Sequence, residues 1–264
     1  MERLTYALKL AYDGRGFRGW QRQPGQATVQ EAVESALASL LGERVRAHGA
    51  ARTDAGVHAS GQVASFSLRR ALDPGALAAL PVPAGLRVLA AAAASRSFHA
   101  RASAAGKRYR YRFAWGPPDG AAFHLGDAQP DWIRARAALE GLRGLPHLAG
   151  LGSPSKARSP APPLDDWSLE VGASAAMLTV RAHSFRKHEV RNLAGHLAAI
   201  ALGFAGPESL PQLARRRRPW NGATAPAHGL TLIEVLYPED LDPFRRRGTA
   251  ERATLRRPTD GGGD

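Results

Sequence analysis

A seven-residue segment near the middle of the chain begins with a lysine and then alternates strictly between arginine and aromatic residues. It reads Lys107-Arg108-Tyr109-Arg110-Tyr111-Arg112-Phe113, with the aromatic rings at every second position. Side chains alternate between the two faces of a β-strand, whereas a helix would scatter these rings around its axis. The segment therefore predicts a strand that buries its aromatic face in a core and turns its arginines outward.

A helix is predicted at residues 28–41. Thr28-Val29-Gln30-Glu31 has the sequence of a capping box, and apolar residues follow at steps of three and four until Gly42. The same spacing predicts a helix around Val190–Ile200. Further strands are predicted at residues 5–12, 45–49, 62–68, 86–93, 167–171, 177–182 and 229–237, and further helices after Asp73, after Asp131 and at residues 209–218.

Each half of the chain therefore combines strands with one long helix, which favours two similar α+β domains. We place them at residues 1–104 and 105–244. Residues 245–264 contain almost no apolar side chains and carry a net charge of +3, so we expect a disordered basic tail.

Composition excludes several classes of protein. Hydrophobic residues make up 44% of the chain and charged residues 22%, which is typical of globular proteins. We expect neither a transmembrane helix nor a signal peptide, and hence a cytoplasmic protein without a membrane partner. The chain has no cysteine, which excludes disulfides, thiolate metal ligands and cysteine nucleophiles.

The charge indicates a polyanionic partner. The chain has 36 Lys and Arg against 23 Asp and Glu, a net charge of +13, and the 20 C-terminal residues account for only +3 of it. All but four of the cations are arginine, which binds phosphate through two nitrogens and stacks on bases, as RNA recognition requires. A genome that prefers arginine codons would explain arginine over lysine but not the net surplus.

Two short motifs suggest cofactors that their context excludes. Residues 14–19 fit the G-x-G-x-x-G pattern of dinucleotide sites, but the helix begins only at Thr28, after Pro24-Gly25. In the segment 188–192, Asn192 occupies the position of the second histidine of a zinc motif. We therefore expect neither a nucleotide cofactor nor a metal.

The polar segment 49–64 holds a single acid, Asp54, among small and basic residues. From spacing alone, Asp54 could simply be a turn residue that bonds its own backbone. However, the run R-T-D-A-G-V-H-A-S-G-Q-V from Arg52 to Val63 resembles the catalytic motif of the TruA family of tRNA pseudouridine synthases. Further matching blocks follow the family's order: Tyr12-Asp13-Gly14 with Gly19–Gln23, Phe98–Arg101 with Lys107–Tyr111, Val190-Arg191-Asn192, and Ala225–Leu230.

The resemblance implies a role for five residues. Asp54 would be the catalytic acid, acting either as a nucleophile or as the base that removes the C2′ proton. Arg191 would pair with Asp54; a phosphate contact or a solvated position is its alternative. Tyr109 would stack on the target uracil and could take the C5 proton. Arg52 would enter the space that the flipped base leaves, and Leu230 would pack on the uracil unless it is only a core residue.

The resemblance also implies a fold and a reaction. The fold is α+β: two similar domains whose antiparallel sheets join into one platform, with helices packed on it and the active-site cleft between the domains. The implied activity is that of a homodimeric tRNA pseudouridine synthase that isomerises uridine at positions 38–40 of the anticodon stem-loop without a cofactor. A catalytically silent tRNA-binding module is the alternative.

The chain departs from the family beside the proposed ion pair. Arg186 stands where the family usually has an apolar residue, and Glu189 stands where it usually has Met or Gln. Residues 144–163, which are rich in Pro, Gly and Ser, also differ. Glu189 could compete with Asp54 for Arg191.

Overall fold

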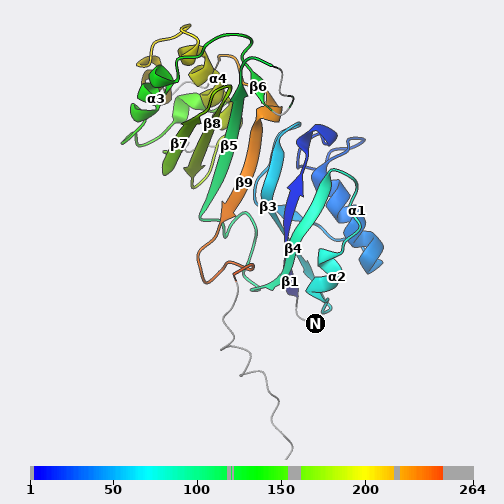
Figure 1. Cartoon of the computed structure of the whole chain (residues 1–264). Helices are drawn as coiled ribbons and strands as arrows, with labels where there is room; N and C mark the ends of the chain where they lie inside the picture. Colours follow the sequence, from blue (N-terminus) through cyan, green and yellow to red (C-terminus); the bar gives the residue numbers. More distant parts are fainter. Residues whose placement is uncertain (1–2, 118–119, 121, 154–161, 217–220, 246–264) are drawn as a thin grey trace, which may run out of the picture.

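One sheet runs through the molecule. The computed structural model describes residues 3–117, 120, 122–153, 162–216 and 221–245, and these residues form a nine-stranded sheet (Figure 1). Its main path is β4-β1-β3-β9-β5-β8-β7, with β2 paired to β3 and β6 to β5. The strands are β1 (Leu4–Tyr12), β2 (His48–Gly49), β3 (His58–Leu68), β4 (Leu86–Ala94), β5 (Gly106–Ala114), β6 (Phe123–His124), β7 (Asp166–Val171), β8 (Ala175–Ala182) and β9 (Leu230–Leu236).

Two antiparallel groups of strands meet at the centre of this sheet. Strands β1, β3 and β4 pair antiparallel in the first half, and β5, β7, β8 and β9 do so in the second. The groups join through a short parallel pairing of β3 with β9, at His58–Thr231 and Ala59–Leu232. This confirms the α+β platform of joined sheets and adds a parallel junction. The domain boundary at residue 104 stays a prediction.

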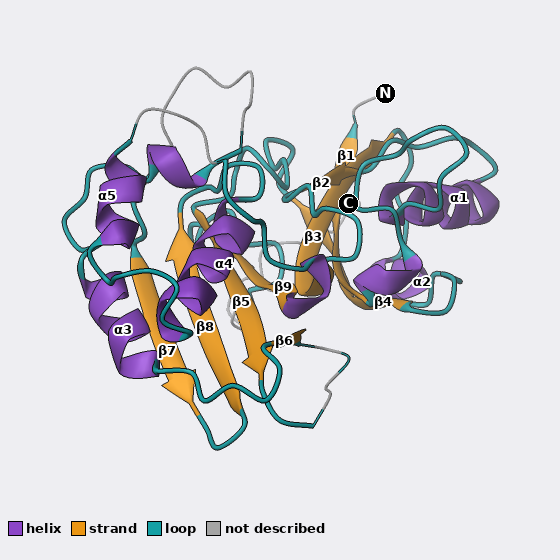
Figure 2. Ribbon diagram, turned by 90° about the horizontal axis from the view of Figure 1, so that it is seen from above, coloured by secondary structure: helices purple, strands orange, loops and turns teal. Residues whose placement is uncertain are grey.

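The helices gather beside the strands of their own half, as Figure 2 shows. They are α1 (Val29–Leu41), α2 (Pro74–Ala78), α3 (Trp132–Glu140), α4 (Glu189–Ala201) and α5 (Ser209–Arg215), with single 3-10 turns η1 (Gly14–Gly16), η2 (Ala149–Leu151) and η3 (Ala227–Gly229). The Thr28 side chain accepts a hydrogen bond from the Glu31 N–H at 3.4 Å, so the predicted cap of α1 is confirmed. The Glu31 carboxylate lies 3.6 Å from Arg22 and forms an ion pair there.

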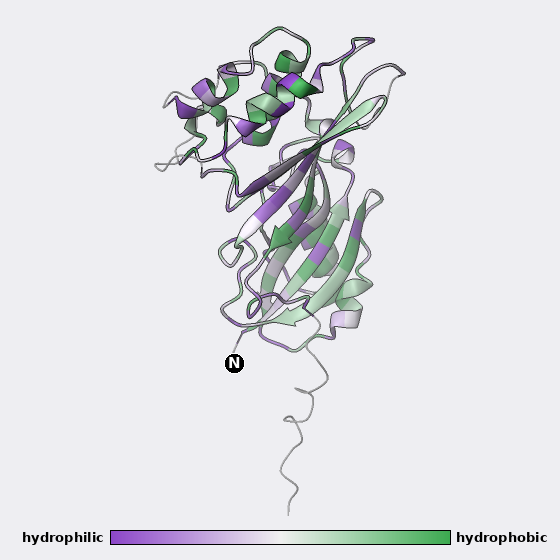
Figure 3. Ribbon diagram, turned by 60° about the vertical axis from the view of Figure 1, so that its left-hand side comes forward, coloured by the Kyte–Doolittle hydropathy of each residue, from purple (hydrophilic) through white to green (hydrophobic). Residues whose placement is uncertain are grey.

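The alternating segment forms β5, as predicted. Tyr109, Tyr111 and Phe113 are buried on one face, whereas Arg110 and Arg112 are exposed on the other. Phe113 packs against Trp132 of α3, with ring centroids 4.9 Å apart. In Figure 3 the strands of the first half are mostly green, consistent with the apolar core that they share with α1.

Several sequence-based element predictions need correction. The strand expected at residues 62–68 begins four residues earlier, at His58. The strand expected at residues 45–49 is limited to His48–Gly49, where the chain pairs with β3. The helix expected at residues 209–218 ends at Arg215, because Arg216 has an extended backbone; residues 217 and 218 lie outside the described part, as does the tail from residue 246. Strand β6 was not predicted. Within the described residues, no helix is long and apolar enough to cross a membrane.

Candidate active site

Hydrogen bonds from buried polar side chains hold the loop that carries Asp54. The Gln62 amide bonds both backbone groups of Ala51, donating to its carbonyl at 2.8 Å and accepting from its N–H at 3.2 Å. The same amide donates to the Tyr12 hydroxyl, which lies 2.8 Å from Thr53 Oγ1. Burial raises the pKa of Tyr12 to about 12, so this phenol stays protonated as part of the scaffold. The loop therefore has little freedom to move Asp54.

Gly19 and Trp20 support the same loop from the neighbouring segment. Trp20 donates its backbone N–H to the Thr53 carbonyl at 3.0 Å. Gly19 has a φ of +88°, and a Cβ there would lie 2.8 Å from the Thr53 carbonyl oxygen. Only glycine suits both the left-handed backbone and this close approach. The glycine-rich segment 14–19 therefore belongs to the support of Asp54, and η1 with its following loop replaces the helix that a dinucleotide site would require.

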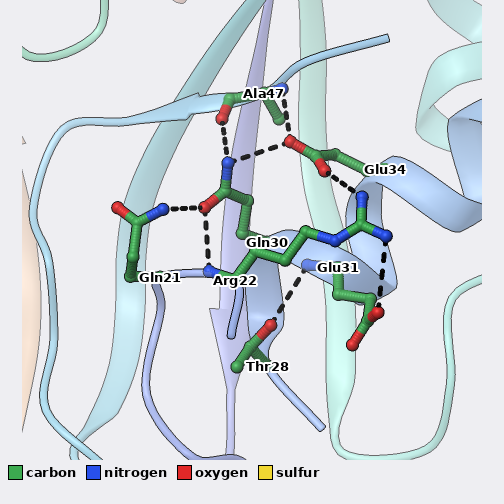
Figure 4. Close-up of polar contacts among 7 residues, drawn as sticks. All are labelled: Gln21, Arg22, Thr28, Gln30, Glu31, Glu34 and Ala47. Atoms are coloured by element: carbon green, nitrogen blue, oxygen red, sulfur yellow. Dashed lines mark hydrogen bonds and ion pairs between the residues drawn. The ribbon is translucent and has the colours of Figure 1, made fainter. Parts of the chain in front are cut away.

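A polar network connects this support to α1 (Figure 4). The side-chain Oε1 of Gln30 accepts from Gln21 Nε2 at 2.8 Å and from the Arg22 backbone N–H at 3.0 Å. Arg22 donates to Glu34 at 3.2 Å, and Glu34 also accepts from the Ala47 N–H at 3.0 Å. Helix α1 thereby holds the segment of Gln21 and Arg22, which follows Trp20, and Ala47, which lies shortly before the Asp54 loop.

The structure brings all five predicted site residues to one cavity of about 720 Å³. Arg52 and Asp54 come from the first half of the chain, and Tyr109, Arg191 and Leu230 come from the second. Six cations line this cavity: Arg52, Arg101, Lys107, Arg186, Lys187 and Arg191. A volume of this size accommodates a small organic molecule or a nucleoside, and the cations suit a phosphate-bearing ligand.

Arg191 pairs directly with Asp54. Its Nη1 donates to Asp54 Oδ2 at 3.1 Å, which is a charge-assisted hydrogen bond. Its Nε donates to the Ala225 carbonyl at 2.8 Å, so the guanidinium is held at two points. Among the described contacts, Glu189 forms no ion pair with Arg191. Its Oε2 instead accepts a hydrogen bond from the Arg186 backbone N–H at 2.6 Å.

Tyr109 and Leu230 form an apolar wall of the cavity that holds the Asp54 carboxylate. Tyr109 is buried in β5, and its ring meets Phe185 edge to face at a centroid distance of 5.2 Å. Burial, with Asp54 as a smaller cause, raises the pKa of the Tyr109 phenol, so it stays protonated at neutral pH. Leu230 is buried at the start of β9, opposite Tyr111. Tyr111 and Phe113 lie in the core, as predicted.

Sequence reasoning missed His188, which lines the cavity beside Asp54. Its Nε2 lies 3.5 Å from Asp54 Oδ2. The sequence showed His188 only as part of a rejected zinc motif, and no local spacing connects it with residue 54. Among the described residues, no group of three or more His, Asp or Glu side chains is arranged to hold a metal ion.

The fold and the cavity define a basic α+β protein with an arginine-paired carboxylate, Asp54, in a nucleoside-sized cavity. Residues 10–83 and 153–238 match the family described as tRNA pseudouridine synthase. Relatives named tRNA pseudouridine synthase A align with 90% of this chain: 37% identity in Methylacidiphilum infernorum over 97% of that relative, 39% in Cereibacter sphaeroides over 98%, and 37% in Methylococcus capsulatus over 91%. The chain belongs to the tRNA pseudouridine synthase family.

Proposed function

We propose that this chain is an enzyme that isomerises uridine to pseudouridine at positions 38–40 of the tRNA anticodon stem-loop. The observation that carries this proposal is the Asp54 carboxylate, bonded to Arg191 at 3.1 Å, in a cavity that it shares with Tyr109 and Leu230. The family and the relatives' names support the reaction and the tRNA substrate. The anticodon position rests on the sequence motifs alone.

The reaction breaks the C1′–N1 bond of uridine, rotates the uracil and joins C1′ to C5. The C5 proton leaves and N1 gains a proton, so the product is an isomer and no oxidant or reductant is needed. Asp54 either attacks the substrate as a nucleophile or removes the C2′ proton as a base. Tyr109 stacks on the uracil and Leu230 packs against it, which keeps the detached base in the cavity while it turns.

The target uridine must first leave its stack, which costs a few kcal/mol. Arg52 is exposed at the edge of the cavity, where its planar guanidinium can fill the vacated space between bases. The six cavity cations and the net charge of +13 attract the phosphate backbone. We further propose that the protein acts as a cytoplasmic homodimer.

The experiment that tests this function is tritium release from C5-labelled uridine in unmodified tRNA. The protein should release tritium, and Asp54→Asn, which keeps the shape of the side chain but removes its charge and basicity, should abolish release while tRNA affinity changes little. Pseudouridine formation by pure Asp54→Asn protein would refute the role of Asp54. Absence of release by the parent protein, with tRNA binding intact, would instead favour the tRNA-binding module.

A further inference from the structure

His188 has an unusual backbone conformation at the edge of the active site. It is the N-terminal cap of α4, and among the described residues it is the one non-glycine residue with positive φ, at +61°. Residues other than glycine seldom adopt this left-handed backbone conformation, and those that do are concentrated at functional sites.

Both nitrogens of the imidazole have polar neighbours. Nε2 lies 3.5 Å from Asp54 Oδ2, and Nδ1 lies 3.0 Å from Ser153 Oγ. Burial lowers the pKa of His188, so the ring is neutral at neutral pH and carries one proton on one of these two nitrogens. The neighbours of Ser153 indicate which nitrogen that is.

Asn192 fixes the orientation of Ser153. Asn192 Nδ2 donates to the Leu151 carbonyl at 2.6 Å, and Asn192 Oδ1 accepts from Thr224 Oγ1 at 2.7 Å, so the direction of this amide is determined. The same Nδ2 lies 3.5 Å from Ser153 Oγ and donates toward it. The Ser153 hydroxyl proton is then available for His188 Nδ1. The ring proton accordingly belongs on Nε2. Without it, the lone pair of Nε2 would face the negatively charged Oδ2 of Asp54 and repel it.

The two neighbours of the Asp54 carboxylate meet the same oxygen. Arg191 Nη1 and His188 Nε2 both face Oδ2, at 3.1 and 3.5 Å. Within the described part of the chain, no hydrogen bond or ion pair reaches Oδ1. One oxygen is thus held by the protein, and the other is left for the substrate.

We propose that His188 is a positioning residue for Asp54, which as the Nε2–H tautomer holds Oδ2 together with Arg191 and so presents Oδ1 to the target uridine. This inference rests on the proposed function, because it concerns the same carboxylate. Donors that are slightly long in a free enzyme commonly shorten when the substrate binds. His188 would therefore contribute to turnover more than to tRNA affinity.

The test compares His188→Gly with His188→Gln. Glycine accepts the left-handed backbone without strain and removes the imidazole, whereas glutamine keeps an N–H donor of similar reach. We expect kcat to fall roughly 10- to 100-fold in His188→Gly, a typical cost of a misplaced catalytic group, with tRNA Kd within about twofold. His188→Gln should recover part of this loss. His183→Gly, at an exposed histidine outside this cavity, is the matched control and should keep full activity.

A second measurement does not depend on activity. Nitrogen-15 spectra of histidine-labelled protein distinguish the two tautomers, and the His188 signal is identified by its loss in His188→Gly. We expect the Nε2–H form. The proposal is overturned by the Nδ1–H form, by a kcat of His188→Gly within twofold of the parent, or by a folded His188→Gln no more active than His188→Gly. A parent protein that forms no pseudouridine would instead refute the proposed function, while the tautomer result would stand.

Discussion

Glu189 is a buried carboxyl group whose replacement should change the pH dependence of stability. Only 3% of the residue is exposed, and its Oε2 accepts from the Arg186 N–H. Oε1 is buried and has no hydrogen-bond partner among the described residues. Burial therefore raises the pKa of Glu189 from 4.5 to about 8, although the Arg186 contacts partly oppose the rise. The folded protein keeps a proton here at neutral pH.

The sign and size of the effect follow from linkage. Between pH 4.5 and 8 the unfolded chain has lost the Glu189 proton and the folded protein retains it, so stability falls as pH rises through this window. Each tenfold change in the acid dissociation constant corresponds to about 1.4 kcal/mol. The change from 4.5 to about 8 therefore corresponds to roughly 5 kcal/mol lost by pH 8.

Glu189→Gln removes this titration and keeps an oxygen for the Arg186 N–H. Its buried NH₂ group takes the place of Oε1 and costs about 1–3 kcal/mol at every pH. The stability difference between variant and parent should therefore move in favour of the variant by roughly 4 kcal/mol between pH 5 and pH 9. Urea unfolding across this range measures the difference, in which the titrations common to both proteins cancel.

Glu189→Met is the matched control, because it also lacks a titratable group but cannot accept from Arg186. Its offset from the parent should differ from that of Glu189→Gln, whereas its dependence on pH should be the same. Parallel stability profiles for the parent and both variants between pH 5 and pH 9 would refute a raised Glu189 pKa.

Three other perturbations test the site. Tyr109→Phe keeps the stacking ring, so tRNA binding should persist while tritium release slows by about 10²–10⁴-fold if the hydroxyl transfers a proton; a rate within about threefold would leave only stacking. Gly19→Ala should push Thr53 and lower kcat, whereas Gly25→Ala, with a similar φ but open space around its Cβ, should leave kcat unchanged. The logarithm of tRNA affinity should fall linearly with that of salt concentration, by about 0.7–0.9 per phosphate neutralised; affinity independent of salt would exclude docking by charge.

Local patterns predicted most of the elements because each carries its own signal. The alternation at residues 107–113 marks the buried face of β5 within a few residues. The capping sequence at Thr28 marks the start of α1 in the same local way. The bounds of the short strand β2 were misplaced, since they depend on its pairing with β3. Helix α5 ends earlier than predicted, where the backbone becomes extended at Arg216. Strand β6 is two residues long, too short for any periodicity to show.

The site was predictable only as far as its motifs could be matched. Asp54 and Arg191 are 137 positions apart, and no spacing rule connects them. The same limit explains why His188 was missed, and why the effect of Glu189 could not be predicted. Whether Glu189 pairs with Arg191 depends on the position of the Arg186 backbone N–H. The backbone turn before α4 sets that position.

The distance between Asp54 and Arg191 depends on the junction of the two halves. Asp54 lies just before β3, and Arg191 is held by Ala225, shortly before β9. Strands β3 and β9 pair through only two residue pairs. The two backbones must therefore lie close together for this junction to be stable. Gly61 of β3 makes it possible, since a Cβ there would lie 2.3 Å from the Ile233 carbonyl oxygen. A residue remote from the chemistry thus sets whether the carboxylate and its arginine can meet.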